Sequence, residues 1–175
     1  MLGLAATWAT VIGGTKSEGV SDGPWRTSLF AGSSEAGPYL RAYIAVHGLL
    51  ALSREETIYY SAADDSEGHA LDGNCSYQLE WRDPPTRWWS ITAYGPDDFL
   101  IPNPADRYSV SMNSVARRAD GTFAATLSKK QVGVDWIPLA AGRFDLTIRL
   151  YNPQSPVVAN PAQVALPVIW KVACE

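Results

Sequence analysis

The sequence predicts a mainly β protein, an antiparallel β-sandwich resembling a jelly roll, with one amphipathic helix packed on it. Three observations lead to this fold class. Stretches in which apolar and polar residues alternate recur along most of the chain, and turn sequences rich in Gly, Pro, Asn and Asp separate them. A single segment has helical spacing instead. The 175 residues are enough for one domain with a sizeable core.

The N-terminal part divides into an apolar segment and a polar linker. Residues 1–14 carry no charged side chain, yet the segment is shorter than the about 20 residues of a membrane-spanning helix. It is open to three interpretations: the distal part of a signal anchor, a short signal peptide, or a buried segment of a cytoplasmic protein. Residues 15–23 are rich in Gly and Ser, as expected of a linker. Residues 24–175 are predicted to form a single β-sandwich domain.

The folded domain is expected to begin near Trp25, because a tryptophan after a Gly-Pro turn can dock on a core and fix a chain end. Pro38 suits the first position of a helix, where its missing N–H costs nothing. Apolar residues then follow at helical spacing, including Leu40 and Ile44. We therefore predict an amphipathic helix over residues 38–52.

From Thr57 onward the hydrophobic period changes to two, and the alternating stretches predict about seven strands. The predicted strands cover residues 57–62, 75–81, 87–94, 107–112, 122–127, 143–151 and 166–173. The Asp120-Gly121 pair is a hairpin signal, whereas residues 136–138 are predicted to interrupt the sheet. Pro167 fits only at an edge or at the first residue of the last strand. The stretch 87–94 is predicted to be the centre of the sheet.

Composition argues against several classes of function. The net charge of −4 and the lack of a basic run interleaved with aromatics argue against a nucleic-acid partner. The chain has no nucleophile elbow, no phosphate loop and no Cys–His pair. With two histidines at unsuitable spacing, we expect no metal site, and we expect no cofactor. The acidic loop 64–73 lacks the spacing of an EF-hand and is interpreted as a solvated turn.

The two cysteines, Cys75 and Cys174, are compatible with a disulfide if the protein is exported. The bond would close a loop of about 100 residues, worth about 4–5 kcal/mol in the chain-entropy model. The spacing alone does not show that the two sulfurs meet. We predict that they are bonded in the oxidised protein.

Aromatic and arginine side chains on the predicted strands suggest a ligand face, because arginines framed by rings can bind a carboxylate or phosphate bidentately. Adjacent Trp88 and Trp89 must point to opposite faces of their strand, so one is expected in the core and the other outside. A purely structural role is the alternative, since Asp106 and Asp145 are available as partners for strand arginines. The candidate ligand-binding residues are Tyr59, Trp89, Tyr94, Asn103, Arg107, Arg149 and Tyr151.

Several segments, in this order and spacing, resemble a bacterial family named domain of unknown function 1214. They are Gly23-Pro24-Trp25, Trp88 to Tyr94, Asn103-Pro104, Asp106 to Ser109, Asp120-Gly121, Asp135 to Pro138 and Phe144 to Pro153. The resemblance runs from about Pro24 to Ile169 and is most specific in the Trp-Ser-Ile-Thr-Ala-Tyr and Arg-Leu-Tyr-Asn-Pro segments. It implies a β-sandwich-like fold and a cell-envelope location, but no reaction. Many relatives carry a companion domain, numbered 1254, for which this chain has no room, so it resembles the short, stand-alone form.

These observations support two hypotheses of different classes. The first is a non-catalytic cell-envelope module that binds a small molecule, a glycan, a lipid or an envelope protein through the aromatic and arginine face. The second is a hydrolase-type enzyme at the Arg107 and Arg149 face, which would require a carboxyl group of raised pKa beside these arginines. The expected location is the periplasm or the inner membrane, with attachment through the N-terminal segment, and the cytoplasm is the alternative.

Overall fold

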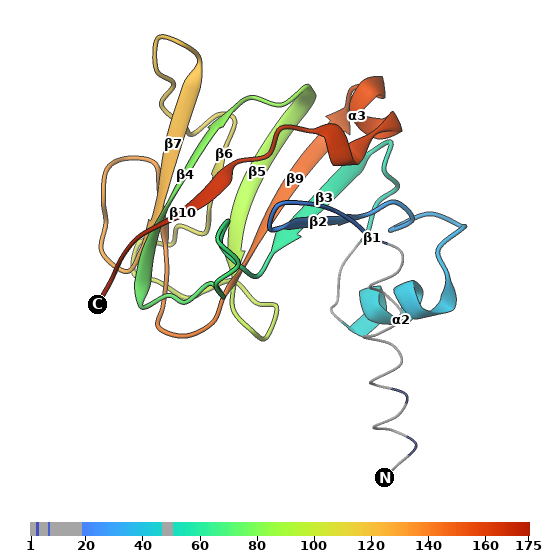
Figure 1. Ribbon diagram of the computed structural model, residues 1–175, viewed down its shortest axis with the longest axis horizontal. Helices are drawn as coiled ribbons and strands as arrows, with labels where there is room; N and C mark the ends of the chain where they lie inside the picture. Colours follow the sequence, from blue (N-terminus) through green and yellow to red (C-terminus); the bar gives the residue numbers. More distant parts are fainter. Residues whose placement is uncertain (1–2, 4–6, 8–18, 47–50) are drawn as a thin grey trace.

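The computed structural model describes residues 3, 7, 19–46 and 51–175, and the text below is confined to these (Figure 1). The predicted apolar segment and residues 15–18 of the predicted linker lie outside the described residues, apart from positions 3 and 7. Residues 19–22, predicted to belong to the linker, instead form a strand, Gly19–Asp22, that pairs with Trp25–Ser28. Gly23, with a φ of +56°, turns the chain between these two strands.

Two sheets build the domain, as the sequence predicts. The larger sheet has six strands in the order β1-β2-β3-β9-β5-β6. Its strands are β1 (Gly19–Asp22), β2 (Trp25–Ser28), β3 (Thr57–Ala62), β5 (Thr86–Tyr94), β6 (Ser109–Ser111) and β9 (Asp145–Pro153). Neighbouring strands in this sheet are antiparallel. Strands β9 and β5 are interior strands with a partner on each side. Residues 87–94, predicted to be the centre of the sheet, lie inside it but next to the short edge strand β6.

The smaller sheet has four strands in the order β10-β4-β7-β8. They are β4 (Cys75–Arg82), β7 (Thr122–Ser128), β8 (Trp136–Pro138) and β10 (Val168–Cys174). Residues 136–138, predicted to interrupt the sheet, instead form β8, which pairs in parallel with β7. Pro138 is tolerated because it is the last residue of a short edge strand.

The core lies between the two sheets, which gives each strand an inner and an outer face. Alternate residues of β5, Trp89, Ile91 and Ala93, are buried in it. The smaller sheet contributes Tyr77 and Phe123, among others, from β4 and β7. Because successive side chains point to opposite faces, Trp88, Ser90, Thr92 and Tyr94 must lie on the outer face of β5.

The helical parts flank the sheets. Helix α2 occupies Pro38–Val46 and buries Leu40. Residues 47–50 of the predicted helix lie outside the described residues, and residues 51–53 are not helical. Two further helical segments, α3 (Ser155–Ala159) and the 3₁₀ helix η1 (Pro161–Gln163), lie between β9 and β10.

Trp25 docks on the core, as the sequence predicts. It is buried, and its indole N–H donates to the carbonyl of Pro167 at 2.7 Å.

A disulfide joins two strands of the smaller sheet. Cys75, at the start of β4, is bonded to Cys174, at the end of β10. Disulfides persist in oxidising compartments. Among the helices of the described residues, none is long and apolar enough to cross a membrane.

One turn differs from its prediction. Gly121 has a φ of +82°, and Asp120 accepts a hydrogen bond from the backbone N–H of Thr122, so the Asp-Gly pair does form a tight turn. The strand that follows, β7, pairs with β4 and β8 rather than with the segment before the turn. Local turn chemistry was therefore predicted correctly, but the partner strand was not.

Candidate functional site

The outer face of the six-stranded sheet, which faces away from the smaller sheet, carries polar and aromatic side chains in rows across the strands. The register aligns Ser61, Thr147, Thr92 and Ser109 in one row of four hydroxyl groups. The next row contains Tyr59, Arg149, Ser90 and Ser111. The third row contains Thr57, Tyr151 and Trp88. We call these three rows, together with Tyr94 of β5, the outer-face site.

Arg149 is the cation at the centre of the outer-face site. Its Nη2 donates a hydrogen bond of 2.7 Å to the hydroxyl of Tyr94, and its Nη1 lies 3.4 Å from Thr92 Oγ1. The guanidinium carbon lies 5.9 Å from the ring centroid of Tyr59 and 5.3 Å from that of Tyr94, within the range of cation–π attraction. No ion pair between Arg149 and a carboxylate is found among the described residues.

Two aromatic side chains lie in the third row, on the side of Arg149 opposite to Thr92 and Tyr94. The rings of Trp88 and Tyr151 are 5.3 Å apart between centroids and tilted by 56°. Both side chains are half-buried, so part of each ring faces solvent. Tyr151 and Arg149 are two residues apart on β9, a separation of about 7 Å along a strand.

The structure brings together four of the seven predicted ligand-binding residues: Tyr59, Tyr94, Arg149 and Tyr151. Trp89 is not among them, because it lies in the core, stacked on Phe123 at 4.8 Å, and its indole N–H donates to Asp83. Trp88 takes its place on the outer face. The sequence contained a signal for this assignment, since Trp89 has the same strand parity as the apolar residues Ile91 and Ala93.

Asn103 and Arg107 belong to the loop between β5 and β6. The Asn103 side chain binds the loop's own backbone, since its Nδ2 donates to the carbonyls of Ile101 and Arg107 and its Oδ1 accepts from two N–H groups. This is the role of an Asx turn rather than of a ligand contact. Arg107 is half-buried two residues before Ser109, and no contact joins it to Arg149 in the described part of the chain.

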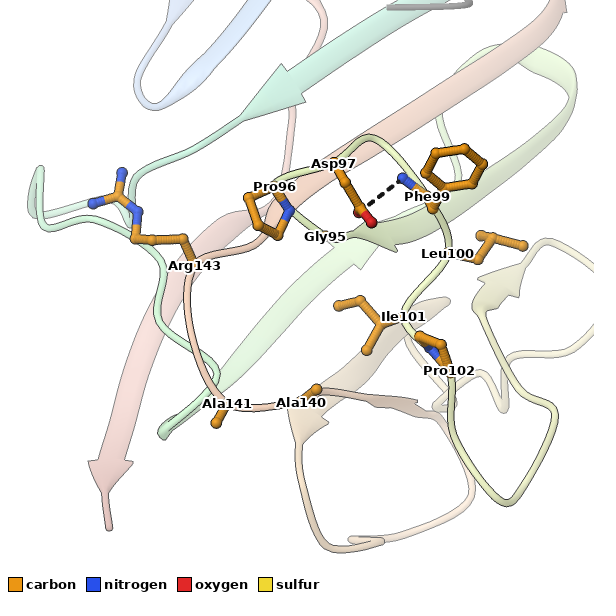
Figure 2. Close-up of a pocket in the computed structure, with 10 residues that line it drawn as sticks. All are labelled: Gly95, Pro96, Asp97, Phe99, Leu100, Ile101, Pro102, Ala140, Ala141 and Arg143. Atoms are coloured by element: carbon orange, nitrogen blue, oxygen red, sulfur yellow. Dashed lines mark hydrogen bonds between the residues drawn. The ribbon is translucent and has the colours of Figure 1, made fainter.

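A separate pocket lies at one end of the sandwich, between the loop after β5 and the loop before β9 (Figure 2). Its lining includes Pro96, Phe99, Ile101, Ala140 and Arg143, but none of the predicted site residues. Its volume of about 240 Å³ is below the roughly 300 Å³ of the smallest typical ligand pockets. Figure 2 shows the Arg143 guanidinium pointing away from the apolar side chains, so charge and apolar surface do not converge there.

Carboxyl groups with clearly shifted pKa values serve structural contacts. Hydrogen bonds from the Arg117 guanidinium lower the pKa of Asp83. Burial opposes this shift in part, and the Trp89 N–H adds to it.

In the acidic loop 64–73, Asp65 accepts hydrogen bonds from the N–H groups of Glu67 and His69. Within the described residues, no group of His, Cys, Asp and Glu is arranged to hold a metal ion. The hydrogen bonds to Asp65 give the loop the turn geometry that the sequence predicted, but Asp65 is buried and paired with Lys171 rather than solvated.

Helix α2 approaches one corner of the same face. Burial raises the pKa of Tyr43, and the negative charges of Asp98 and Asp145 raise it further. Asp145 is the first residue of β9 and pairs with Tyr94, so the helix lies close to the Tyr94 end of the outer-face site.

The fold and this site define a two-layer β-sandwich domain whose larger sheet carries hydroxyl and aromatic side chains around one arginine on its outer face. Thr57, Ser90 and Thr92 of this set are buried. The chain belongs to the family described as "Protein of unknown function (DUF1214)", whose pattern matches residues 56–155. This confirms the family that the sequence resembles. The matched part includes β3, β5 and β9, which carry most of the outer-face site. No curated protein matches the chain.

Two solved structures share the fold. The VPA0106 protein from Vibrio parahaemolyticus superposes with a TM-score of 0.67 at 23% identity, over 79% of this chain and 36% of that protein. An uncharacterised protein from Burkholderia cenocepacia superposes with a TM-score of 0.51 at 14% identity, over 88% of this chain and 36% of that one. This chain thus spans about a third of the length of both, and the likeness concerns the fold alone.

Proposed function

We propose that this domain is a non-catalytic binding module of the cell envelope that recognises an anionic group through Arg149. The observation that carries the proposal is the placement of a half-buried guanidinium between two tyrosine rings on a sheet face. An arginine has five N–H donors in a planar fork that matches a carboxylate or phosphate. Contacts with Tyr94 and Thr92 use two of them, which leaves donors for a ligand.

The surroundings of Arg149 favour an anionic ligand over a neutral one. Charge-assisted hydrogen bonds are about twice as strong as neutral ones, and partial burial reduces the screening by water. The Tyr94 hydroxyl holds the guanidinium in one orientation. A preorganised donor of this kind loses less conformational freedom on binding than a free surface arginine.

A location in the cell envelope is supported by two independent features. The Cys75–Cys174 disulfide is typical of proteins that fold outside the cytoplasm. The apolar sequence of residues 1–14 is compatible with export or membrane attachment. Labelling of free thiols after denaturation without a reductant tests the location, since the proposal requires that neither cysteine reacts in protein isolated from cells.

The hydrolase hypothesis lacks a comparable supporting observation. It requires a carboxyl group of raised pKa beside Arg107 or Arg149. The carboxyl groups of the described residues whose pKa values are clearly shifted all have lowered ones: Glu55, Asp65, Asp83, Asp120 and Glu175. We therefore retain the binding module as the proposed function.

Titration of the purified protein with simple carboxylates and phosphates tests anion recognition. Binding should change the tryptophan fluorescence, because Trp88 lies in the row next to Arg149, and it should weaken as salt is raised. The Arg149→Gln variant removes the charge and should reduce affinity about tenfold or more. Arg82→Gln, at an exposed arginine on β4 of the other sheet, is the matched control. Equal affinities of the two variants would refute the proposal.

A further inference from the structure

The outer face around Arg149 has three features that together specify a ligand class. A row of four hydroxyl side chains, Ser61, Thr147, Thr92 and Ser109, crosses four strands. A pair of tilted rings, Trp88 and Tyr151, lies two residues away along the strands. Arg149 lies in the row between them.

The hydroxyl row offers regularly spaced donors and acceptors. Neighbouring strands are about 4.8 Å apart, so each hydroxyl group is about one strand spacing from the next. A hydroxyl both donates and accepts hydrogen bonds, which suits a ligand with many hydroxyl groups of its own. Thr92 is buried and its Oγ1 lies 3.4 Å from Arg149 Nη1, so Ser61, Thr147 and Ser109 supply the accessible hydroxyl groups on either side of the cation.

The aromatic pair offers an apolar surface next to the cation. Trp88 and Tyr151 are half-buried and stand about 7 Å along the strand from the Arg149 row, two residues at the usual rise. The Arg149 side chain extends away from this pair toward Thr92 and Tyr94, so a sugar ring on the pair leaves the guanidinium to the carboxylate of the next unit of the ligand. Such a ligand needs an apolar ring face, several hydroxyl groups and one negative charge.

We propose that the outer-face site binds an acidic saccharide, with a sugar ring on Trp88 and Tyr151 and a sugar carboxylate on Arg149. The inference deepens the proposed function and depends on it, because it names the ligand class of the same arginine. A uronic acid has these three chemical features in one residue: a ring face, hydroxyl groups and a carboxylate. Simple carboxylates lack the ring, and neutral sugars lack the charge.

The test is a calorimetric titration of the full chain with a linear oligouronic acid. A neutral oligosaccharide of the same linkage, with each carboxyl group reduced to an alcohol, is the matched ligand control. We expect the acidic form to bind at least about tenfold more tightly than the reduced form, as loss of one charge-assisted contact predicts. Arg149→Gln should abolish this preference for the acidic form.

Trp88 variants test the ring platform separately. Trp88→Ala should weaken binding of the oligouronic acid several-fold while leaving the affinity for acetate unchanged, and Trp88→Phe should retain part of the saccharide affinity. Trp170→Ala is the control, since Trp170 is an exposed tryptophan on the other sheet. Circular dichroism and the thermal midpoint of each variant confirm that it is folded.

The outcomes separate the two proposals. If simple anions bind in an Arg149-dependent way but the oligouronic acid binds no better than they do, the saccharide inference is wrong and the proposed function stands. If neither binds to the folded wild-type protein, both are wrong. Saccharide binding that Trp88→Ala leaves unchanged would also overturn the inference, because the sugar would then lie elsewhere.

Discussion

Arg149 and Tyr94 are joined across neighbouring strands by a hydrogen bond of 2.7 Å from the guanidinium to the phenol oxygen. The contact fixes a long, charged side chain against the outer face of the sheet instead of leaving it free in solvent. It also links two neighbouring interior strands, β5 and β9, on the side opposite the core. A single pair of residues thus contributes both to the stability of the sheet and to the geometry of the proposed site.

Replacement of Tyr94 by Phe removes the phenol oxygen and keeps the ring. We expect the free energy of unfolding to fall by about 1 kcal/mol, the usual cost of one such hydrogen bond, and anion affinity to fall because Arg149 is less well oriented. Urea denaturation measures the first effect and fluorescence titration the second. Tyr39→Phe, at an exposed tyrosine outside the outer-face site, is the control, since no hydrogen bond of its hydroxyl is found among the described residues. If both variants behave alike, the Tyr94 hydroxyl does not orient Arg149.

The disulfide between Cys75 and Cys174 joins residues 99 positions apart. Reduction should lower the free energy of unfolding by about 4–5 kcal/mol in the chain-entropy model, because it releases a long loop of the unfolded chain. Urea denaturation with and without a reductant measures the loss. The double variant Cys75→Ser/Cys174→Ser should be as unstable as the reduced protein and should not respond to the reductant. An unchanged midpoint on reduction would show that the bond contributes nothing.

Asp65 should make stability depend on pH in the acidic range. Burial by itself raises its pKa, but the His69 N–H, the Lys171 ammonium and the Glu67 N–H lower it further, so the net pKa is below the ordinary value of 3.8. Since the folded pKa is the lower one, ionised Asp65 stabilises the fold above the unfolded pKa. That contribution is lost as the pH falls through the folded pKa.

The Asp65→Asn variant tests this dependence. It removes the ion pair with Lys171, whose Nζ lies 3.2 Å from Asp65 Oδ2. We expect a loss of about 1–3 kcal/mol at pH 7, as for other charged contacts with a buried partner. The difference from the wild type should shrink as the pH falls below about 4, toward the region where Asp65 is protonated in both states. Glu67→Gln, in the same loop but exposed, should change little at either pH. A difference independent of pH would contradict the assignment.

Much of the fold could be predicted from local patterns. Alternation of apolar and polar residues located β3 over residues 57–62 without error, and it placed the interior strands β5 and β9 to within a few residues. Which strands pair with each other could not be predicted from local patterns, because pairing depends on packing between segments far apart in the sequence. The parallel pairing of β8 with β7 leaves no trace in the alternation of so short a strand.

The candidate site was only partly predictable for the same reason. Residues on one strand, such as Arg149 and Tyr151, must share a face because they are two positions apart. Whether Tyr59 and Tyr94 join them depends on the register of three strands, which the sequence does not contain. Asn103 has a side chain suited to a ligand contact, yet that side chain hydrogen-bonds to the backbone of its own loop.

The two adjacent tryptophans of β5 test which face of this strand lies in the core. Trp89 is fully buried, stacked on Phe123 and hydrogen-bonded to Asp83, so Trp89→Ala should cost about 3–5 kcal/mol of unfolding free energy. Trp88→Ala loses chiefly its contact with Tyr151 and should cost about 1 kcal/mol. Urea denaturation of both variants measures the difference.

Ligand binding should show the opposite order, because only Trp88 lies on the outer face. Trp89→Phe keeps an aromatic ring in the core, so it should remain folded and bind the ligand of the outer-face site as the wild type does. Trp88→Ala should bind the ligand less tightly than the wild type does, although Trp88→Ala should be more stable than Trp89→Ala. A Trp88 variant more damaging to stability than the Trp89 variant would mean that the register of β5 is shifted by one residue, and the proposed site would lose its basis, since a shift of one position exchanges the two faces of a strand.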